Sequence, residues 1–93
     1  MNKIEAVKFL EKELAQYRKM PYSDLVKKVG EQETLEKIDE SDEKFHIEVD
    51  FFFDDKEKKT LRVSAMLSYD FWTDFSPISR DFIVALDGKF IDE

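Results

Sequence analysis

The most constraining feature of this chain is a pair of segments in which apolar and polar residues alternate, residues 45–53 and 61–69. Successive side chains of an extended strand point to opposite faces, so each segment has one apolar and one largely polar face. The apolar positions are Phe45, Ile47, Val49, Phe51, Phe53, Leu61, Val63, Ala65, Leu67 and Tyr69. We therefore predict two strands that bury their odd-numbered side chains.

A charged segment, residues 54–58, separates these strands and predicts the turn of an antiparallel hairpin. If Phe53 faces Leu61, position 51 pairs with 63, 49 with 65 and 47 with 67 on the buried face. The same register fixes the pairs on the opposite face. They are Phe52 with Arg62, Asp50 with Ser64, Glu48 with Met66, and His46 with Ser68.

The first thirty residues have the periodicity of two helices. Asn2 can cap a helix over residues 3–18, and Pro21 ends it. A shorter helix is expected at about 21–29, followed by Gly30 in a left-handed conformation. Apolar residues recur every three or four positions in the first helix. They are Ile4, Val7, Leu10, Leu14 and Tyr17.

Two further segments complete the expected sheet. Residues 32–39 alternate poorly and carry many charges, which favours a weak edge strand. Residues 80–86 supply a last strand, which ends in a turn at Asp87–Gly88. The connections are too short for helical crossovers, so the sheet is an antiparallel meander. We expect one α+β domain, residues 1–93, with two N-terminal helices packed on one face of a roughly four-stranded sheet.

Composition and charge restrict the classes of function. The chain has no cysteine, which excludes disulfides and thiolate metal sites and fits a cytoplasmic location. No apolar stretch has the length of a signal peptide or a membrane span. The net charge is −7, with +2 in residues 1–31, −6 in residues 32–60 and −3 in the remainder. An acidic middle and C-terminal part repels phosphate, so we expect no nucleic-acid binding. Without a membrane span we expect no membrane partner either.

Apolar residues outside the predicted core suggest a surface for a protein partner. Phe71, Trp72 and Phe75 lie in a segment that breaks the alternation, and aromatic residues commonly anchor interfaces. Phe52 and Met66 have the parity of the opposite sheet face. We assign these residues to partner binding. The alternatives are that the segment folds over the open end of the sheet, that Phe52 stacks on Arg62, or that the surface joins two copies of the chain.

Residues capable of catalysis or metal binding are sparse. His46 is the only histidine, and its predicted neighbour Ser68 lacks an evident oxyanion donor. Asp54, Asp55 and Glu57 crowd one turn, but their spacing matches no calcium loop and nearby lysines neutralise them. Isolated glycines form no phosphate-binding loop. We therefore assign no catalytic, metal-binding or cofactor-binding residue and expect no cofactor.

Three segments resemble a family of small bacterial domains of unknown function. They are Tyr22–Gly30, Phe53–Asp55 followed by Leu61–Val63, and Phe82–Phe90. The resemblance covers roughly residues 17–93. It implies a compact α+β domain and carries no catalytic residues. The order of helices followed by a β-meander is also similar to the cystatin-like arrangement, as an analogy of layout, and a fold does not fix function.

Together these features favour a non-enzymatic cytoplasmic bacterial protein that acts as an interaction or binding module. Its aromatic residues would contact a partner, and its acidic residues would attract a basic protein, as in an immunity-like or inhibitor-like protein. The alternative is a small enzyme or small-ligand-binding domain with a pocket between helix and sheet. Its acid–base candidates would be His46, Asp70 and Asp74.

Overall fold

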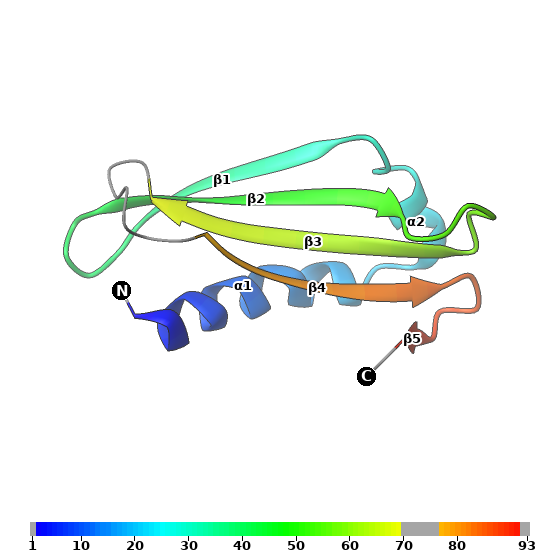
Figure 1. The fold of residues 1–93 in the computed structure, drawn as a ribbon, viewed down its shortest axis with the longest axis horizontal. Helices are drawn as coiled ribbons and strands as arrows, with labels where there is room; N and C mark the ends of the chain where they lie inside the picture. The colour runs from blue at the N-terminus through cyan, green and yellow to red at the C-terminus, as the bar shows by residue number, and fades with distance from the viewer. Residues whose placement is uncertain (1, 70–76, 92–93) are drawn as a thin grey trace.

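An antiparallel sheet with strand order β1-β2-β3-β4-β5 forms one layer of the structure, and α1 packs against β3 and β4 (Figure 1). The computed structural model describes residues 2–69 and 77–91. The described elements are α1 (Lys3–Arg18), α2 (Tyr22–Val26), β1 (Gln32–Ile38), β2 (Lys44–Phe53), β3 (Thr60–Tyr69), β4 (Ile78–Ala85) and β5 (Phe90–Ile91). The predicted α+β class and meander topology are confirmed.

The register of the β2–β3 hairpin is the predicted one. Phe53 pairs with Leu61, and the other pairs on both faces follow from this alignment. Side chains alternate between buried and half-buried along almost the whole of both strands. The alternation specified the register because a shift of one residue would turn every apolar side chain of one strand toward solvent.

Helix α1 begins at its predicted cap and buries one stripe of side chains. The Asn2 side chain accepts a hydrogen bond from the Glu5 backbone N–H at 2.9 Å, which satisfies one free donor of the first turn. The buried stripe starts at Ala6, whereas Ile4 of the predicted stripe is 69% exposed. The first turn of α1 therefore lies outside the core.

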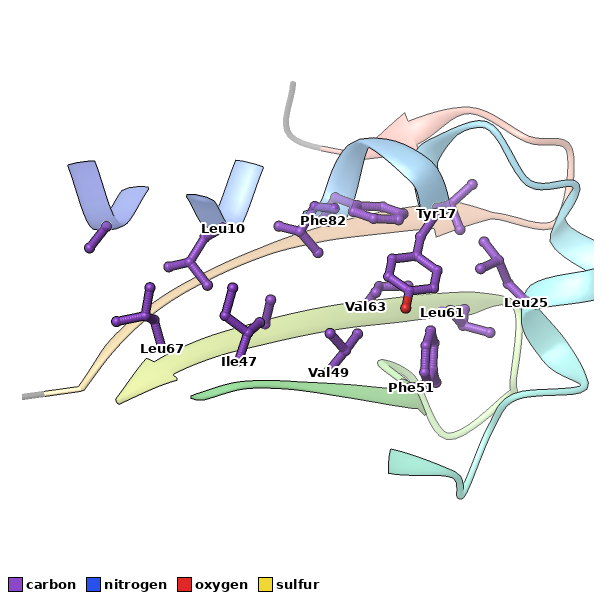
Figure 2. Packing of buried hydrophobic residues seen from close by; sticks show 14 of the residues in the cluster. Leu10, Tyr17, Leu25, Ile47, Val49, Phe51, Leu61, Val63, Leu67 and Phe82 are labelled. Carbon is purple, nitrogen blue, oxygen red and sulfur yellow. The ribbon is translucent and has the colours of Figure 1, made fainter. Parts of the chain in front are cut away.

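The core lies between α1 and the odd-numbered side chains of β2 and β3 (Figure 2). Leu10 of α1 has no exposed surface, and the Tyr17 ring meets the Phe51 ring edge-to-face at 5.2 Å. Leu25 of α2 joins the same cluster. The remaining buried apolar side chains are Ala6, Leu14, Phe45, Ile47, Val49, Leu61, Val63, Ala65, Leu67, Phe82 and Val84.

Two elements differ from the sequence-based prediction. Helix α2 ends at Val26, and turns then lead to Gly30, whose φ of +88° is the expected left-handed conformation. After β4 the chain turns through Gly88, also at φ +88°, and returns as β5. The described sheet therefore has five strands, in agreement with the predicted sheet of roughly four. A two-residue strand lacks the length to produce an alternation pattern.

Polar side chains join β1 to the flank of α1, which we call the α1–β1 seam. Glu13 is buried and forms an ion pair with Lys37 at 3.2 Å. Glu33 accepts hydrogen bonds from Lys28, at 2.7 Å, and from the Tyr17 hydroxyl. The bond from Lys28, followed by that from Tyr17, lowers the pKa of Glu33. Burial, then the Glu33 carboxylate, raises the pKa of Tyr17.

The buried stripe of α1 yields a test of the core. Leu10→Ala should lower the free energy of unfolding by about 2–5 kcal/mol, because it removes a fully buried side chain and leaves a cavity. Leu86→Ala is the control, because it makes the same change at a residue that is 66% exposed. It should change the free energy of unfolding by less than about 0.5 kcal/mol. Urea denaturation of both variants measures the difference. Equal effects would contradict the burial of α1 against the sheet.

Candidate functional site

The outward side of the sheet, opposite α1, is a candidate surface of the described chain. Both α1 and α2 contribute to the core on the inner side. The outward side chains of β1 to β4 follow from the strand registers, and we call this surface the open face. It includes Gln32, Thr34, Glu36, Lys44, His46, Glu48, Asp50, Phe52, Thr60, Arg62, Ser64, Met66, Ser68, Ser79, Asp81, Ile83 and Ala85.

The predicted partner-binding residues Phe52 and Met66 both lie on the open face. Phe52 is 42% exposed, and Met66 is half-buried. They do not adjoin, because the pair Asp50–Ser64 lies between their rows. Four residues of strand separate the rows, which corresponds to about 13 Å. Phe71, Trp72 and Phe75, the other predicted contacts, lie outside the described residues.

Arg62, the cross-strand neighbour of Phe52, binds carboxylates. Its Nε donates to Asp54 at 2.8 Å, and its guanidinium also donates to Asp81 of β4. These two hydrogen bonds raise the pKa of Arg62. The guanidinium thus points at the carboxylates of Asp54 and Asp81. The alternative from the sequence was that it stacks on the Phe52 ring.

The remaining charges leave the open face acidic. Glu36 lies 4.0 Å from Lys44 and 3.7 Å from His46, and Asp50 accepts a hydrogen bond from Gln32 at 2.9 Å. Glu48 is half-buried, and its side chain makes no ion pair or hydrogen bond within residues 2–69 and 77–91. A cationic group approaching this face would therefore meet an available carboxylate near its centre.

His46 lies between an acid and a hydroxyl in one row of the open face. Its strand neighbours are Glu36 on β1 and Ser68 on β3. The 3.7 Å from His46 Nδ1 to Glu36 Oε1 exceeds hydrogen-bond range. A nucleophilic serine needs a base within hydrogen-bond reach and donors for an oxyanion. The row supplies the residue types, and Glu36 at 3.7 Å does not orient the imidazole by a hydrogen bond. Asp70 and Asp74, the other acid–base candidates, lie outside the described residues.

The acidic turn between β2 and β3 closes the hairpin with its own carboxylates. Asp55 accepts hydrogen bonds from the backbone N–H groups of Lys59 and Thr60, each at 2.9 Å, and from the Thr60 hydroxyl. The hydrogen bond from the Thr60 N–H is the main cause of a lowered pKa of Asp55. Within the described part of the chain, no cluster of three or more His, Asp or Glu side chains is placed to hold a metal ion.

Two hollows flank α1. Phe9 and Ile38 contribute to one of about 320 Å³, beside the turn between β1 and β2. The other, of about 330 Å³, lies between the first two turns of α1 and the start of β4. Its lining is Lys3, Ile4, Val7, Lys8 and Arg80. Sequence analysis missed this second hollow, because its formation depends on where β4 passes α1. The exposed Ile4 is the one signal that the helix pattern left unexplained.

The space between α1 and the centre of the sheet, where a small enzyme or binding domain would have its pocket, is filled by fully buried side chains, among them Leu10, Leu14 and Ile47. The described helices include none with the length and apolar character of a membrane span. Comparison with protein-family models, with curated proteins and with solved structures finds no match to this chain.

The Asp55 hydrogen bonds predict a pH dependence of stability. A carboxyl group whose pKa is lower in the folded than in the unfolded state stabilises the fold above its unfolded value, here 3.8. This contribution disappears as the pH falls through the lower folded pKa. Asp55→Asn keeps one acceptor oxygen but cannot ionise, so the variant should be less stable than the wild type at about pH 7.

The difference between the two proteins should shrink as the pH falls from about 5 to about 2. Urea denaturation across this range measures it. Asp42→Asn is the matched control, because no side-chain hydrogen bond of Asp42 is present in the described structure. A gap between wild type and Asp55→Asn that does not change with pH would refute the role of the ionised carboxylate.

Proposed function

We propose that this chain is a non-enzymatic interaction module that binds a basic protein through its open face. The observation that carries this proposal is the acidic character of a sheet face whose opposite side holds both described helices. Glu48 offers a carboxylate without a partner in the described structure, and Phe52 offers an exposed aromatic ring. Aromatic contacts supply affinity at interfaces, whereas complementary charge raises the association rate and selects the partner.

Charge favours a basic partner over a second copy of this chain. A symmetric dimer through the open face would bring identical surfaces together and oppose their carboxylates. Like charges brought together across an interface are destabilising. A partner with lysine or arginine side chains would instead pair with Glu48 and with the neighbouring Glu36.

The proposal includes the aromatic residues Phe71, Trp72 and Phe75 as further contacts, on the basis of their residue types. Masking of a basic surface on a toxin or an enzyme is the specialised form of this function, that of an immunity-like or inhibitor-like protein. The absence of cysteine supports action in the reducing cytoplasm.

Charge reversal on the open face tests the proposal. Affinity capture from the source cell, with wild-type protein as bait, should retain a basic protein that Glu48→Lys retains poorly. With that protein purified, calorimetry should give about tenfold weaker binding for Glu48→Lys, and weaker binding to the wild type at higher salt. Glu11→Lys, the same charge change at an exposed position of α1, is the control and should bind as the wild type does.

Three outcomes would contradict the proposal. Equal loss of binding in Glu48→Lys and Glu11→Lys would indicate attraction to net charge alone. Unchanged binding in Glu48→Lys would place the interface elsewhere. Recovery of only further copies of this chain would indicate a homodimer.

Trp72 provides an independent optical test, because it is the only tryptophan of the chain. If Trp72 belongs to the binding surface, its emission should shift to shorter wavelength and become less accessible to acrylamide when the captured partner is added. The cause is the transfer of the indole ring out of water. Phe52→Ala serves as a comparison, because it should weaken the complex and so require more partner for the same shift. An emission spectrum unaffected by a saturating partner would remove Trp72 from the interface.

A further inference from the structure

Half of strand β4 has an edge that no described strand covers. On one side β4 pairs with β3 from Ile78 to Ala85. On the other side β5 pairs only with Ile83 and Val84 (Figure 1). The backbone of residues 78–81 therefore has an unpaired edge within the described structure. Such an edge is a template for another extended segment.

Hydrogen bonds at the end of β4 show which groups face this edge. The Ala85 N–H donates to Lys89 on the β5 side, and the Leu86 N–H donates to Lys59 on the β3 side. Because the N–H groups of a strand alternate in direction, those of Ser79 and Asp81 point the same way as that of Ala85. Two N–H donors, together with the carbonyl groups of the same residues, thus face away from β3.

The 330 Å³ hollow lies directly beside this edge. Arg80 has the parity of the inner sheet side, as do the buried Phe82 and Val84, and it meets the first two turns of α1. Ile4 and Val7 of α1 supply the apolar part of the lining. A strand added to β4 would run about 4.8 Å from it and would direct alternate side chains into this hollow.

The charge of the hollow is opposite to that of the chain as a whole. Three of its lining residues are cationic, Lys3, Lys8 and Arg80, and none is acidic. None of the three forms an ion pair within the described residues, and the Arg80 guanidinium donates a hydrogen bond to the Ser79 carbonyl at 2.8 Å. In a protein of net charge −7, such a group of available cations favours an anionic occupant.

We propose that an acidic peptide segment of a partner protein binds here by adding a strand to the free edge of β4. Its main chain pairs with Ser79 and Asp81, which gives affinity. Its carboxylate side chains meet Lys3, Lys8 and Arg80, and an aliphatic side chain between them covers Ile4 and Val7. This site goes beyond the proposed function, because it uses a different surface and selects the opposite charge.

The test uses a defined peptide probe and the full chain. The probe carries Glu, Val and Glu at alternate positions separated by Thr, Ac-Glu-Thr-Val-Thr-Glu-Thr-amide, with a fluorescent label for anisotropy. We expect saturable binding that weakens with salt. Amide chemical shifts should change most at Ser79 and Asp81, and their hydrogen exchange should slow when the probe is bound.

Two changes separate main-chain pairing from charge attraction. A probe with N-methyl groups on alternate amides keeps its charges but loses donors, so its binding should fall at least about tenfold. Ser79→Pro removes one edge donor of the protein without removing a bond to β3, and it should have the same effect. Circular dichroism of Ser79→Pro verifies that the fold is retained. If that variant does not fold, the N-methylated probe alone decides the point.

Substitution of a cationic residue of the hollow tests whether the site selects acidic segments. Arg80→Glu should weaken binding of the probe about tenfold. Lys12→Glu has the same effect on net charge from a position of α1 outside this hollow, and it should leave the affinity unchanged. A probe with Gln in place of both Glu residues should bind weakly, and one with Lys should not bind.

The proposal is overturned if the N-methylated probe binds as well as its parent, or if Lys12→Glu weakens binding as much as Arg80→Glu. It is also overturned if the Lys probe binds equally well, or if the shifted amides lie elsewhere. Stronger binding in Glu48→Lys with the Arg80→Glu variant unaffected would assign the probe to the open face instead, because the added cation attracts an acidic segment there.

Discussion

The structure depends on the burial of the odd-numbered face of the β2–β3 hairpin under α1. Ile47 and Val63 have no exposed surface, and neither has Leu10, which packs against them in one cluster. Burial of such side chains is the main favourable contribution to folding. Because side chains alternate along a strand, burying this face also determines which residues form the open face. The position of every outward charge on β2 and β3 follows from this single contact between layers.

The strong alternation in residues 45–69 predicted the hairpin and its register, and the cap at Asn2 predicted the start of α1. Local sequence patterns were weaker in short or charged segments. For this reason β5 was not predicted, and α2 was predicted to be longer than it is. The candidate sites were predicted less well. Parity placed Phe52 on the open face, but the partners of Arg62 depend on a loop and on β4. The basic hollow depends on how α1 and β4 meet, which residue spacing does not encode.

The two proposed surfaces differ in charge and in the groups that would contact a partner. The open face offers side chains alone, since the backbone groups of β2 and β3 are already paired within the sheet. The edge of β4 offers backbone groups for main-chain pairing with an extended segment, and the adjoining cations favour an acidic one. Two such surfaces on one small domain would let it hold a basic protein and an acidic segment at the same time. The −7 charge of the chain thus obscures a local division of charge.

The α1–β1 seam has a consequence for how β1 is held. On the inner side of β1, Leu35 is the apolar contact with the core, and it is only partly buried. The rest of that side is held by the ion pairs of Glu13 with Lys37 and of Glu33 with Lys28. Pairs of this kind weaken in acid and in concentrated salt, whereas the contacts of β2 and β3 do not. The inner side of β1 therefore depends more on charge than the inner sides of β2 and β3 do, although all seven of its residues pair with β2.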